Sequence, residues 1–211
     1  MRAIIVTGGN KPSREILLRY IKKDDFIIGV DSGCNSLYEY KIMPDLVLGD
    51  FDSAKEEVIE YYKKENVQLI QFNPEKDYTD TDLGYEKAKE KGCTEILFFG
   101  ATGTRVDHSL GNIGILLKAL RQGISAEIID ENNRVLLANH AMEISGLYGE
   151  TISFHAISEV VKNFTIKGAK YKLDSYDMTL FEPRAVCNEF LAENIIISFD
   201  SGIVMIIFAN D

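Results

Sequence analysis

Short apolar runs alternate with helical segments along roughly the first 130 residues, and this alternation restricts the fold more than any other feature. The runs AIIV, FIIGV, LVLG, QLIQF, EILFF and AEIID have the length of buried strands, and each of the first five precedes a segment suited to a helix. Strands alternating with helices form βαβ units, whose parallel strands are covered on both faces. The pattern predicts an open, mostly parallel α/β/α module.

Residues at the expected helix ends agree with this interpretation. Ser13 precedes an apolar stripe that includes Ile16 and Leu17, so it is expected to be a helix N-cap. Gly92 and Gly123 follow two later helical segments, where a left-handed backbone conformation favours glycine. These signals set the approximate ends of three helices.

The sequence pattern changes from alternating strands and helices to strands alone after Asn132 and Asn133. The runs RVLLA, TISFHA, VVKNFTIKG, NIIISF and GIVMIIF are short and rich in β-branched residues, and Gly, Asn, Asp and Ser separate them. A series of this kind is typical of a β-sandwich. We therefore expect two domains: an α/β domain of residues 1–132 and a smaller all-β sandwich of residues 133–211.

Charge and apolar runs exclude several functions. The net charge is −10 and no Lys/Arg-rich block stands out, so nucleic acid is not an expected partner. No apolar run approaches the roughly 20 residues of a membrane span, and the first apolar run is too short for a signal peptide. The three cysteines are odd in number and widely spaced, which argues against a disulfide framework. We expect a cytoplasmic protein with no membrane partner.

Aspartates collect in the loops that follow the expected strands. Open α/β sheets bind their ligands beyond the carboxyl ends of the strands, where these loops lie together. Four of the first five such loops contain aspartate, which is more than helix capping alone would explain. The loops are Thr7–Asn10, Asp31–Gly33, Gly49–Ser53, Asn73–Asp82 and Gly100–His108.

The segment LVLGDFDSA places Asp50 and Asp52 directly after an apolar run. If the strand geometry continued through both residues, the two carboxylates would point to the same side. Two like charges held close together favour a cation between them. Oxygen ligands without a cluster of histidines or thiolates favour Mg²⁺, which commonly bridges carboxylates to substrate phosphates.

Glycines and one arginine in the same loops suit phosphate. The stretches TGGN and GATGTR would let backbone N–H groups approach phosphate oxygens. Arg105 either binds phosphate or forms an ion pair with Asp107, and the spacing alone leaves both open. Asp107 is equally suited to an N-cap and to an acceptor near the site. For His108 the residues alone favour a structural hydrogen bond.

Once these motifs are assembled, the chain resembles the bacterial thiamine pyrophosphokinases. DSGCN resembles that family's D-G-G-A-N pattern, with Ser32 and Cys34 in place of Gly and Ala, and PDLVLGDFDS contains its G-D-F-D-S segment. EKDYTDTDL resembles its D-x-T-D segment, and GATGTRVDHSLGN resembles its G-A-x-G-x-R-x-D-H-x-x-x-N block. In the second part, IKGAKYKL resembles a G-x-x-Y-x-L stretch, and AVCNEF resembles an S-N-E motif with Cys187 in place of Ser.

The resemblance implies transfer of the pyrophosphoryl group of ATP to the hydroxyethyl oxygen of thiamine, giving thiamine diphosphate and AMP. It also implies a homodimer in which thiamine lies between one subunit's catalytic module and the other's sandwich, and stacking on thiamine by a Tyr or Phe, because the chain has no Trp. The implied catalytic residues are Asp50, Asp52, Asp80, Arg105 and Asp107, and the implied Mg²⁺ ligands are Asp31, Asp50, Asp52 and Asp80. The implied ATP-binding residues are Gly8, Gly9, Asn10, Asp77, Thr79, Gly100, Thr102, Arg105, His108 and Asn112. The implied thiamine-binding residues are Asp31, Asp80, Cys187 and Asn188.

Two other functions remain as alternatives. An apolar strand ending in D-x-D also begins the haloacid-dehalogenase-like phosphohydrolases, in which Asp50 would be the nucleophile; that interpretation leaves GATGTRVDH unexplained. A non-catalytic sensor of nucleotide or thiamine could use the same scaffold, although such a protein could discard some of the carboxylates. The released product separates these functions from pyrophosphoryl transfer.

Overall fold

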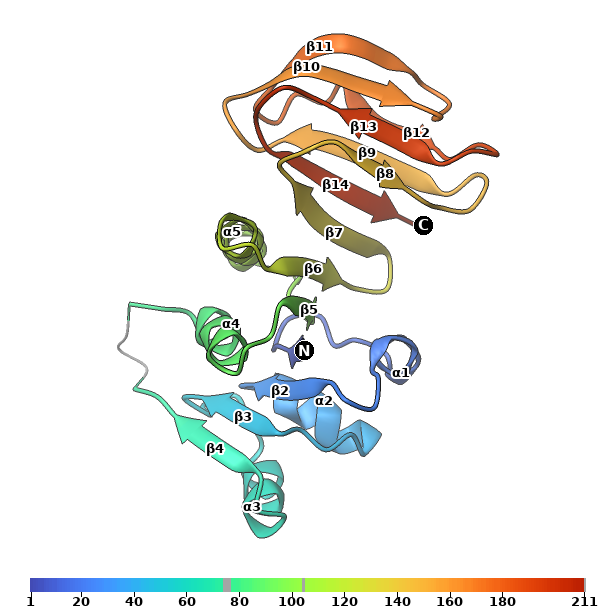
Figure 1. Cartoon of the computed structure of the whole chain (residues 1–211). Coiled ribbons are helices and arrows are strands. Elements are labelled where there is room, and N and C mark those ends of the chain that lie inside the picture. The colour runs from blue at the N-terminus through green and yellow to red at the C-terminus, as the bar shows by residue number, and fades with distance from the viewer. Residues whose placement is uncertain (74–76, 104, 211) are drawn as a thin grey trace. The chain divides into compact units, whose positions relative to one another are not determined.

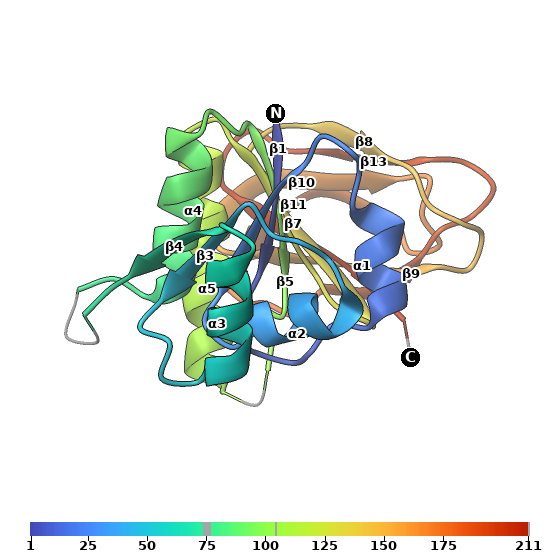
Figure 2. The same ribbon diagram turned by 90° about the horizontal axis from the view of Figure 1, so that it is seen from below.

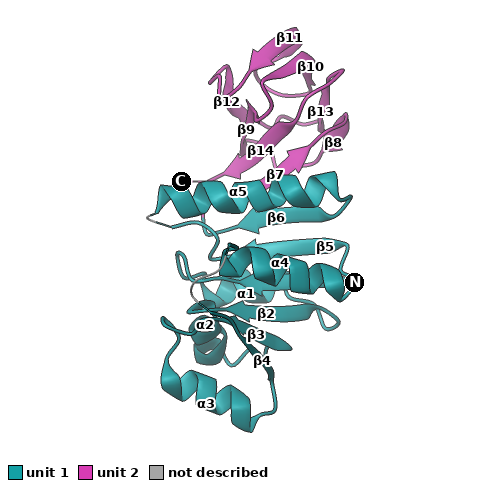
Figure 3. Ribbon diagram, turned by 90° about the vertical axis from the view of Figure 1, so that its left-hand side faces the viewer, with its two compact units in different colours: residues 1–131 teal, residues 132–211 magenta. Residues whose placement is uncertain are grey.

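The computed structural model describes residues 1–73, 77–103 and 105–210 of the chain. It contains two compact units, unit 1 (Met1–Glu131) and unit 2 (Asn132–Asp211), coloured separately in Figure 3. Unit 1 contains both helices and strands, whereas the elements described in unit 2 are strands (Figure 1).

Strands and helices alternate through unit 1, as the sequence pattern predicts. Its strands are β1 (Arg2–Val6), β2 (Phe26–Val30), β3 (Leu46–Gly49), β4 (Gln68–Gln71), β5 (Glu95–Phe99) and β6 (Ser125–Ile129). Its helices are α1 (Arg14–Tyr20), α2 (Gly33–Tyr40), α3 (Glu56–Lys64), α4 (Asp80–Glu90) and α5 (Val106–Arg121).

The strands of unit 1 pair in the order β6-β5-β1-β2-β3-β4, and each of these pairings is parallel. The chain moves outward from β1 to β4 and then returns to β5 on the other side of β1. Helix α4, which makes this return, and α5 lie on one side of the strands, and α1 lies on the other (Figure 2). The open parallel α/β/α architecture is confirmed, and its order reverses between β1 and β5.

The sheet is apolar on both faces because helices cover both. Ile4 and Val6 of β1 pack with Ile16 and Leu17 of α1 in one cluster, and Ile5 between them is also fully buried. A strand buried on both faces reads as a continuous apolar run rather than as an alternating one. This is why AIIV could be identified from the sequence.

The predicted helix ends are confirmed. The Ser13 side chain accepts a hydrogen bond from the backbone N–H of Ile16 at 3.1 Å, as an N-cap does. Gly92 and Gly123 have φ angles of 86° and 72°, in the left-handed region.

Unit 2 is the predicted β-sandwich. One of its sheets has the order β12-β9-β14-β7 and the other β11-β10-β13-β8, with antiparallel pairing in both. Phe154 of β9 and Phe164 of β10 come from different sheets and their ring centroids are 5.7 Å apart in one shared apolar core. The strands are β7 (Asn133–Ala138), β8 (Met142–Ile144), β9 (Thr151–Ala156), β10 (Val160–Lys167), β11 (Leu173–Thr179), β12 (Ala185–Glu189), β13 (Ile195–Ser198) and β14 (Val204–Ala209).

Three of these strands, β8, β11 and β12, are missing from the apolar runs identified in the sequence. Strand β8 has only three residues, most of β11 is solvent-accessible, and the register of β12 shifts between Ala185 and Asn188. None of them therefore has a clear apolar alternation. Among the described residues no helix has the length and apolar character needed to cross a lipid bilayer.

Candidate active site

A cleft of about 590 Å³ opens in unit 1 beyond the carboxyl ends of the strands. The loops after β1 and β5 both line it, so it lies where the strand order reverses. That is the position at which open α/β sheets bind ligands, because the loops on either side of the reversal diverge to opposite faces. The loop after β2 and the first turns of α4 and α5 complete the wall.

Most of the site residues predicted in unit 1 line this cleft. They are Gly8, Gly9, Asn10, Asp31, Thr79, Asp80, Gly100, Thr102, Arg105, Asp107, His108 and Asn112. Asp50, Asp52 and Asp77 are not among the lining residues, although their neighbour Ser53 is. Glu75 and Lys76 of the EKDYTDTDL segment and Thr104 of GATGTR lie outside the described residues.

The glycine-containing loops after β1 and β5 bind each other through their backbones. The N–H of Gly9 donates to the carbonyl of Gly100 at 2.8 Å, and the N–H of Asn10 donates to the carbonyl of Thr102 at 2.7 Å. A Cβ atom on Gly9 would lie 2.2 Å from the Thr102 carbonyl oxygen, so glycine is required here by the neighbouring loop. These two N–H groups therefore already have backbone partners, and the expected approach of N–H groups in the two stretches to phosphate stays a prediction for the others.

Side-chain hydrogen bonds also fix the loop after β5. The Thr7 hydroxyl donates to the Gly100 carbonyl at 2.5 Å, and the Thr102 hydroxyl donates to Asp130 at 2.8 Å. The side-chain amide of Asn112 donates to the Ala101 carbonyl at 2.6 Å. This bond anchors the loop, and the expected contact of Asn112 with ATP stays a prediction. Thr7 and Asp130 are positioning residues that no sequence motif indicated, although each directly follows a strand of the sheet.

The strand does not continue through Asp50 and Asp52. Strand β3 ends at Gly49, and Phe51 has a φ angle of 65°, which is left-handed rather than extended. The chain turns here, and Oδ1 of Asp50 accepts a hydrogen bond from the backbone N–H of Asp52 at 3.0 Å. Aspartate commonly stabilises turns in this way. Strand alternation therefore does not determine where these two carboxylates point.

Asp31 brings a carboxylate to the loop that contains Asp50. The backbone N–H of Asp31 donates to the Leu48 carbonyl at 3.0 Å. A Cβ atom on Gly49 would lie 1.7 Å from Oδ1 of Asp31, so this carboxylate lies directly against the residue that precedes Asp50. Glycine at position 49 therefore leaves room for the Asp31 side chain.

Arg105 and Asp107 form an ion pair at the wall of the cleft. Both guanidinium contacts are short, at 3.2 Å to Oδ1 and 2.6 Å to Oδ2 of Asp107. The hydrogen bond from Arg105 lowers the pKa of Asp107 to about 2. Asp107 also accepts from the N–H of His108 at 3.0 Å. The N-cap position of α5 belongs to Arg105, so Asp107 is not the N-cap.

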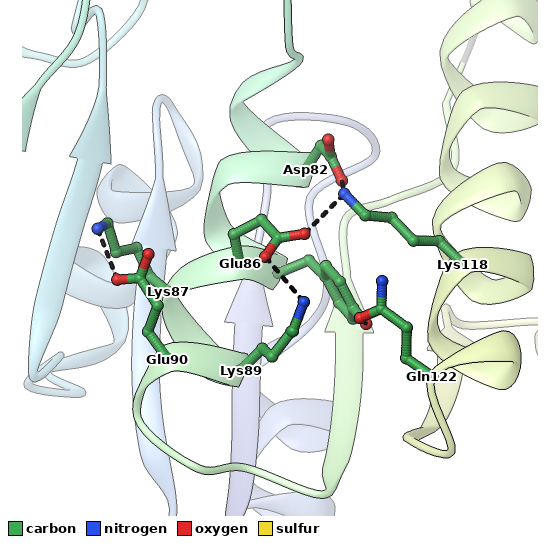
Figure 4. A network of polar contacts seen from close by, with 8 residues as sticks. Asp82, Glu86, Lys87, Lys89, Glu90, Lys118 and Gln122 are labelled. Atoms are coloured by element: carbon green, nitrogen blue, oxygen red, sulfur yellow. Dashed lines mark hydrogen bonds and ion pairs between the residues drawn. The ribbon is translucent and has the colours of Figure 1, made fainter.

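The first turn of α4 carries Thr79 and Asp80 to the cleft. The Thr79 side chain caps the helix by accepting from the N–H of Asp82 at 3.2 Å. Asp82 is bound in turn by Lys118 of α5 at 2.7 Å, as Figure 4 shows. The two helices whose first turns line the cleft are therefore tied together by side chains.

The two predicted site residues of unit 2 lie on β12. Asn188 is buried, and its side chain accepts from the N–H of Tyr171 at 2.9 Å and donates to the carbonyl of Tyr171 at 2.7 Å. Tyr171 is 58% exposed. Cys187 is exposed, with a φ angle of 56°, and its backbone N–H donates to the Ser153 hydroxyl at 3.0 Å.

A glycine-lined, aspartate-containing cleft at the reversal point of a parallel sheet is typical of an α/β enzyme that acts on a phosphorylated ligand. Comparison with known families and structures identifies the family. The family model for the thiamin pyrophosphokinase catalytic domain matches residues 17–128, and the model for the thiamin pyrophosphokinase vitamin B1 binding domain matches residues 136–204. The chain therefore belongs to the thiamine pyrophosphokinase family.

Individual relatives agree over the whole chain. The chain is 35% identical to a thiamine pyrophosphokinase of Bacillus subtilis over 214 aligned residues, which cover 98% of each protein. The crystal structure of a thiamine pyrophosphokinase from Bacillus subtilis superposes with a TM-score of 0.89 at 32% identity, with all of both chains covered. That of a thiamin pyrophosphokinase from Geobacillus thermodenitrificans superposes with a TM-score of 0.85 at 30% identity, covering 100% of this chain and 98% of the other.

Proposed function

We propose that the chain transfers the pyrophosphoryl group of ATP to thiamine and releases AMP. The observation that carries the proposal is the cleft at the reversal point of the sheet, where carboxylates, hydroxyls and an arginine lie around glycine-containing loops. Residues 1–132 would form the catalytic domain that binds Mg-ATP, and residues 133–211 the domain that binds thiamine.

In this reaction the hydroxyethyl oxygen of thiamine attacks the β-phosphorus of ATP. A new oxygen–phosphorus bond forms, the bond between the α,β-bridging oxygen and the β-phosphorus breaks, and AMP leaves. The hydroxyl proton passes to a carboxylate of the cleft, whose lining includes Asp31, Asp80 and Asp107. Arg105 stabilises negative charge on the phosphates. Such transfers depend mainly on positioning and electrostatics and need no covalent enzyme intermediate.

Mg²⁺ is part of the proposal. Within residues 1–73, 77–103 and 105–210 no group of three or more His, Cys, Asp or Glu side chains is suited to hold a metal ion. Mg²⁺ usually binds one or two carboxylates and takes its other ligands from water and substrate phosphates. The adjacent Asp31 and Asp50 loops, with Asp52 and Asp80, fit a Mg²⁺ that is shared with the nucleotide. When bound, the ion would neutralise charge on the phosphates.

For thiamine we propose contacts from unit 2. Tyr171 is a candidate to stack on the thiamine rings, because Asn188 fixes its backbone and leaves its side chain exposed. Cys187 directly precedes Asn188 on β12 and presents a thiol where the related motif has a hydroxyl. The proposal extends to a homodimer in which thiamine contacts two subunits.

The shared site can be tested by complementation between inactive variants. Arg105→Ala alters the catalytic unit and Tyr171→Ala alters the thiamine unit. If each site uses residues from both subunits, mixed dimers contain one site with neither substitution, so mixing the variants after subunit exchange restores up to a quarter of the wild-type turnover in a statistical mixture. No recovery in mixed dimers, or a monomeric active enzyme in light scattering, contradicts the shared site.

The alternative functions are not favoured. A phosphohydrolase with Asp50 as its nucleophile would give no role to Arg105 and Asp107, which follow β5 and line the cleft. A sensor would have no need of the complete set of candidate catalytic groups. A cytoplasmic location belongs to the same proposal, because ATP is available there and the three cysteines are free, as expected in a reducing compartment.

Product analysis tests the function directly. The full-length chain is incubated with thiamine, ATP and Mg²⁺, and the products are separated by chromatography. We expect AMP and thiamine diphosphate in equal amounts, with no reaction when thiamine or Mg²⁺ is omitted. ADP with thiamine monophosphate would indicate a monophosphate kinase, and free phosphate formed without thiamine would indicate a phosphohydrolase.

A further inference from the structure

A second hollow, of about 270 Å³, lies beside the main cleft. Residues 7–9 and Ser32 line both, so the two spaces share a wall. Among the described residues, the charged ones that line the hollow are Lys11, Glu39 and Lys55. Lys11 is bound by Glu39 at 2.7 Å, and this pairing leaves Lys55 as the source of net positive charge.

Lys55 occupies a position where lysine is unfavourable for the local structure. It is the N-cap of α3, and its side chain makes no capping hydrogen bond. Ser, Thr, Asp and Asn are preferred at this position, and a positive charge is repelled by the positive end of the helix dipole. Within the part of the chain that the structure describes, Lys55 forms no ion pair that would offset this cost. Residues that break a local rule without compensation are often functional.

The backbone at Lys55 is held firmly beside the hollow. Asn35, in the first turn of α2, accepts a hydrogen bond from the N–H of Lys55 at 3.0 Å and donates to the Ser53 carbonyl at 3.3 Å. One side chain therefore fixes both ends of the segment that leads into α3. The backbone from which the Lys55 side chain extends is therefore fixed next to the hollow that Lys55 lines.

Ser32 supplies a hydroxyl at the wall between the two spaces. A Cβ atom on Gly8 would lie 2.3 Å from Oγ of Ser32, so the glycine leaves room for this hydroxyl. Although Ser32 is the N-cap of α2, its side chain makes no capping hydrogen bond there. It is thus a donor facing the cleft in a position where the related motif has glycine.

We infer that this hollow binds the terminal phosphate of ATP, with Lys55 and Ser32 as its donors. The inference rests on the proposed function. Among the described residues, the main cleft is lined by three carboxylates and by one arginine, which is paired with Asp107. A triphosphate with about four negative charges needs more cations than a metal and that arginine supply. The ammonium group of Lys55 in the neighbouring hollow supplies a further cation for the γ-phosphate. The γ-phosphate stays attached to the β-phosphate that is transferred.

Binding of adenine nucleotides to Lys55→Ser tests the assignment, because serine also restores a favourable N-cap. Calorimetry with Mg²⁺ and without thiamine is expected to show ATP affinity weakened about tenfold, with ADP and AMP affinities unchanged and the Tm unchanged or raised. Ser32→Gly should weaken the affinity for ATP by a smaller factor and leave the affinities for ADP and AMP unchanged. The matched control is Lys64→Ser, which removes the same charge from the exposed opposite end of α3 and should change no affinity.

Two results would overturn the assignment. Unchanged ATP affinity in Lys55→Ser would show that the ammonium group does not bind the nucleotide. Equally weakened affinities for ATP, ADP and AMP would show that Lys55 contacts a part of the nucleotide other than the terminal phosphate.

Turnover separates this inference from the proposed function. If the wild type forms no AMP with thiamine, the proposed function fails whatever the binding data show. If the wild type is active and Lys55→Ser has the same KM for ATP, only the phosphate subsite fails.

Discussion

The ammonium group of Lys118 on α5 lies 2.7 Å from Oδ1 of Asp82 on α4. It also lies 2.8 Å from Oε1 of Glu86, one turn further along α4 (Figure 4). The Asp82 side chain is only 15% exposed and that of Lys118 is 31% exposed, so solvent screens this bridge less than a surface ion pair. Asp82 lies in the first turn of α4, which lines the cleft, so the bridge fixes that wall of the cleft against α5.

We predict that Lys118→Met lowers the free energy of unfolding by about 1 kcal/mol, because Asp82 then loses the cation that bridges it to α5 and, among the described residues, Glu86 keeps only Lys89, at 3.4 Å. Turnover should fall several-fold as the first turn of α4, which lines the cleft, loses its attachment to α5. Chemical denaturation and steady-state kinetics measure the two effects, and Lys118→Arg should restore most of both.

The control for Lys118 is Lys87→Met. Lys87 pairs with Glu90 at 2.7 Å on α4 itself and does not reach α5, as Figure 4 shows. Its removal should change stability by a few tenths of a kcal/mol and leave turnover unchanged. Equal effects of the two substitutions would mean that the bridge between the helices has no special role.

We predict that Gly9→Ala destabilises the chain by about 2 kcal/mol and abolishes most turnover. The added Cβ atom would lie 2.2 Å from the Thr102 carbonyl oxygen and 2.3 Å from that of Gly100, so the two loops must separate. Gly114→Ala is the matched control, because a Cβ atom there meets nothing within 4 Å on an exposed face of α5. Helix propensity makes that control more stable by about 0.5–1 kcal/mol. Similar stability losses in both variants would refute the packing argument.

For Arg105→Ala we expect turnover to fall by about tenfold or more with little change in Tm. The Arg105 and Asp107 side chains are 67% and 63% exposed, and ion pairs at such positions contribute little to stability. Kinetics at saturating and limiting ATP, together with a thermal melt, measure both effects. A lower Tm with an unchanged rate would instead assign Arg105 a structural role.

We predict that Asp50→Asn and Asp52→Asn each abolish turnover without unfolding the chain. If these carboxylates hold Mg²⁺, the neutral amide is a much weaker ligand for a hard cation. In Asp50→Asn the side-chain amide oxygen can still accept from the backbone N–H of Asp52, so the turn is preserved. Turnover measured at limiting Mg²⁺ gives the most sensitive assay, and wild-type rates there would exclude a metal role.

His155 on β9 should make the stability of the sandwich depend on pH. Burial lowers its pKa below the ordinary value of 6.5, and no partner for its buried Nδ1 is found among the described residues. The unfolded chain therefore binds a proton more readily than the folded chain. This contribution is fully present above the unfolded pKa and is lost as the pH falls toward the folded one.

Between about pH 7.5 and 5.5, the wild type should accordingly lose more stability than His155→Gln, which cannot be protonated. Denaturant titrations at several pH values give the slopes. Parallel curves for the two proteins would show that the histidine is not the cause.

The sequence by itself determined the architecture of this protein, because apolar periodicity and helix caps act locally. AIIV and LVLG indicated buried parallel strands, and Ser13, Gly92 and Gly123 marked helix ends that the structure confirms. The motifs also indicated the family. The sequence did not indicate strands β8 and β11, because short or solvent-accessible strands have little apolar periodicity.

Only the tertiary structure decided how the site is built, because that depends on contacts between residues far apart in the chain. The N–H groups of Gly9 and Asn10 suited phosphate in the sequence, yet the carbonyl groups of Gly100 and Thr102, far along the chain, bind them. Asp50 and Asp52 looked like a strand pair, but the left-handed Phe51 turns the chain between them. No local sequence pattern indicated a function for Lys55 or Lys118. Lys55 lines the hollow and Lys118 binds Asp82, and both relationships depend on residues distant in the sequence.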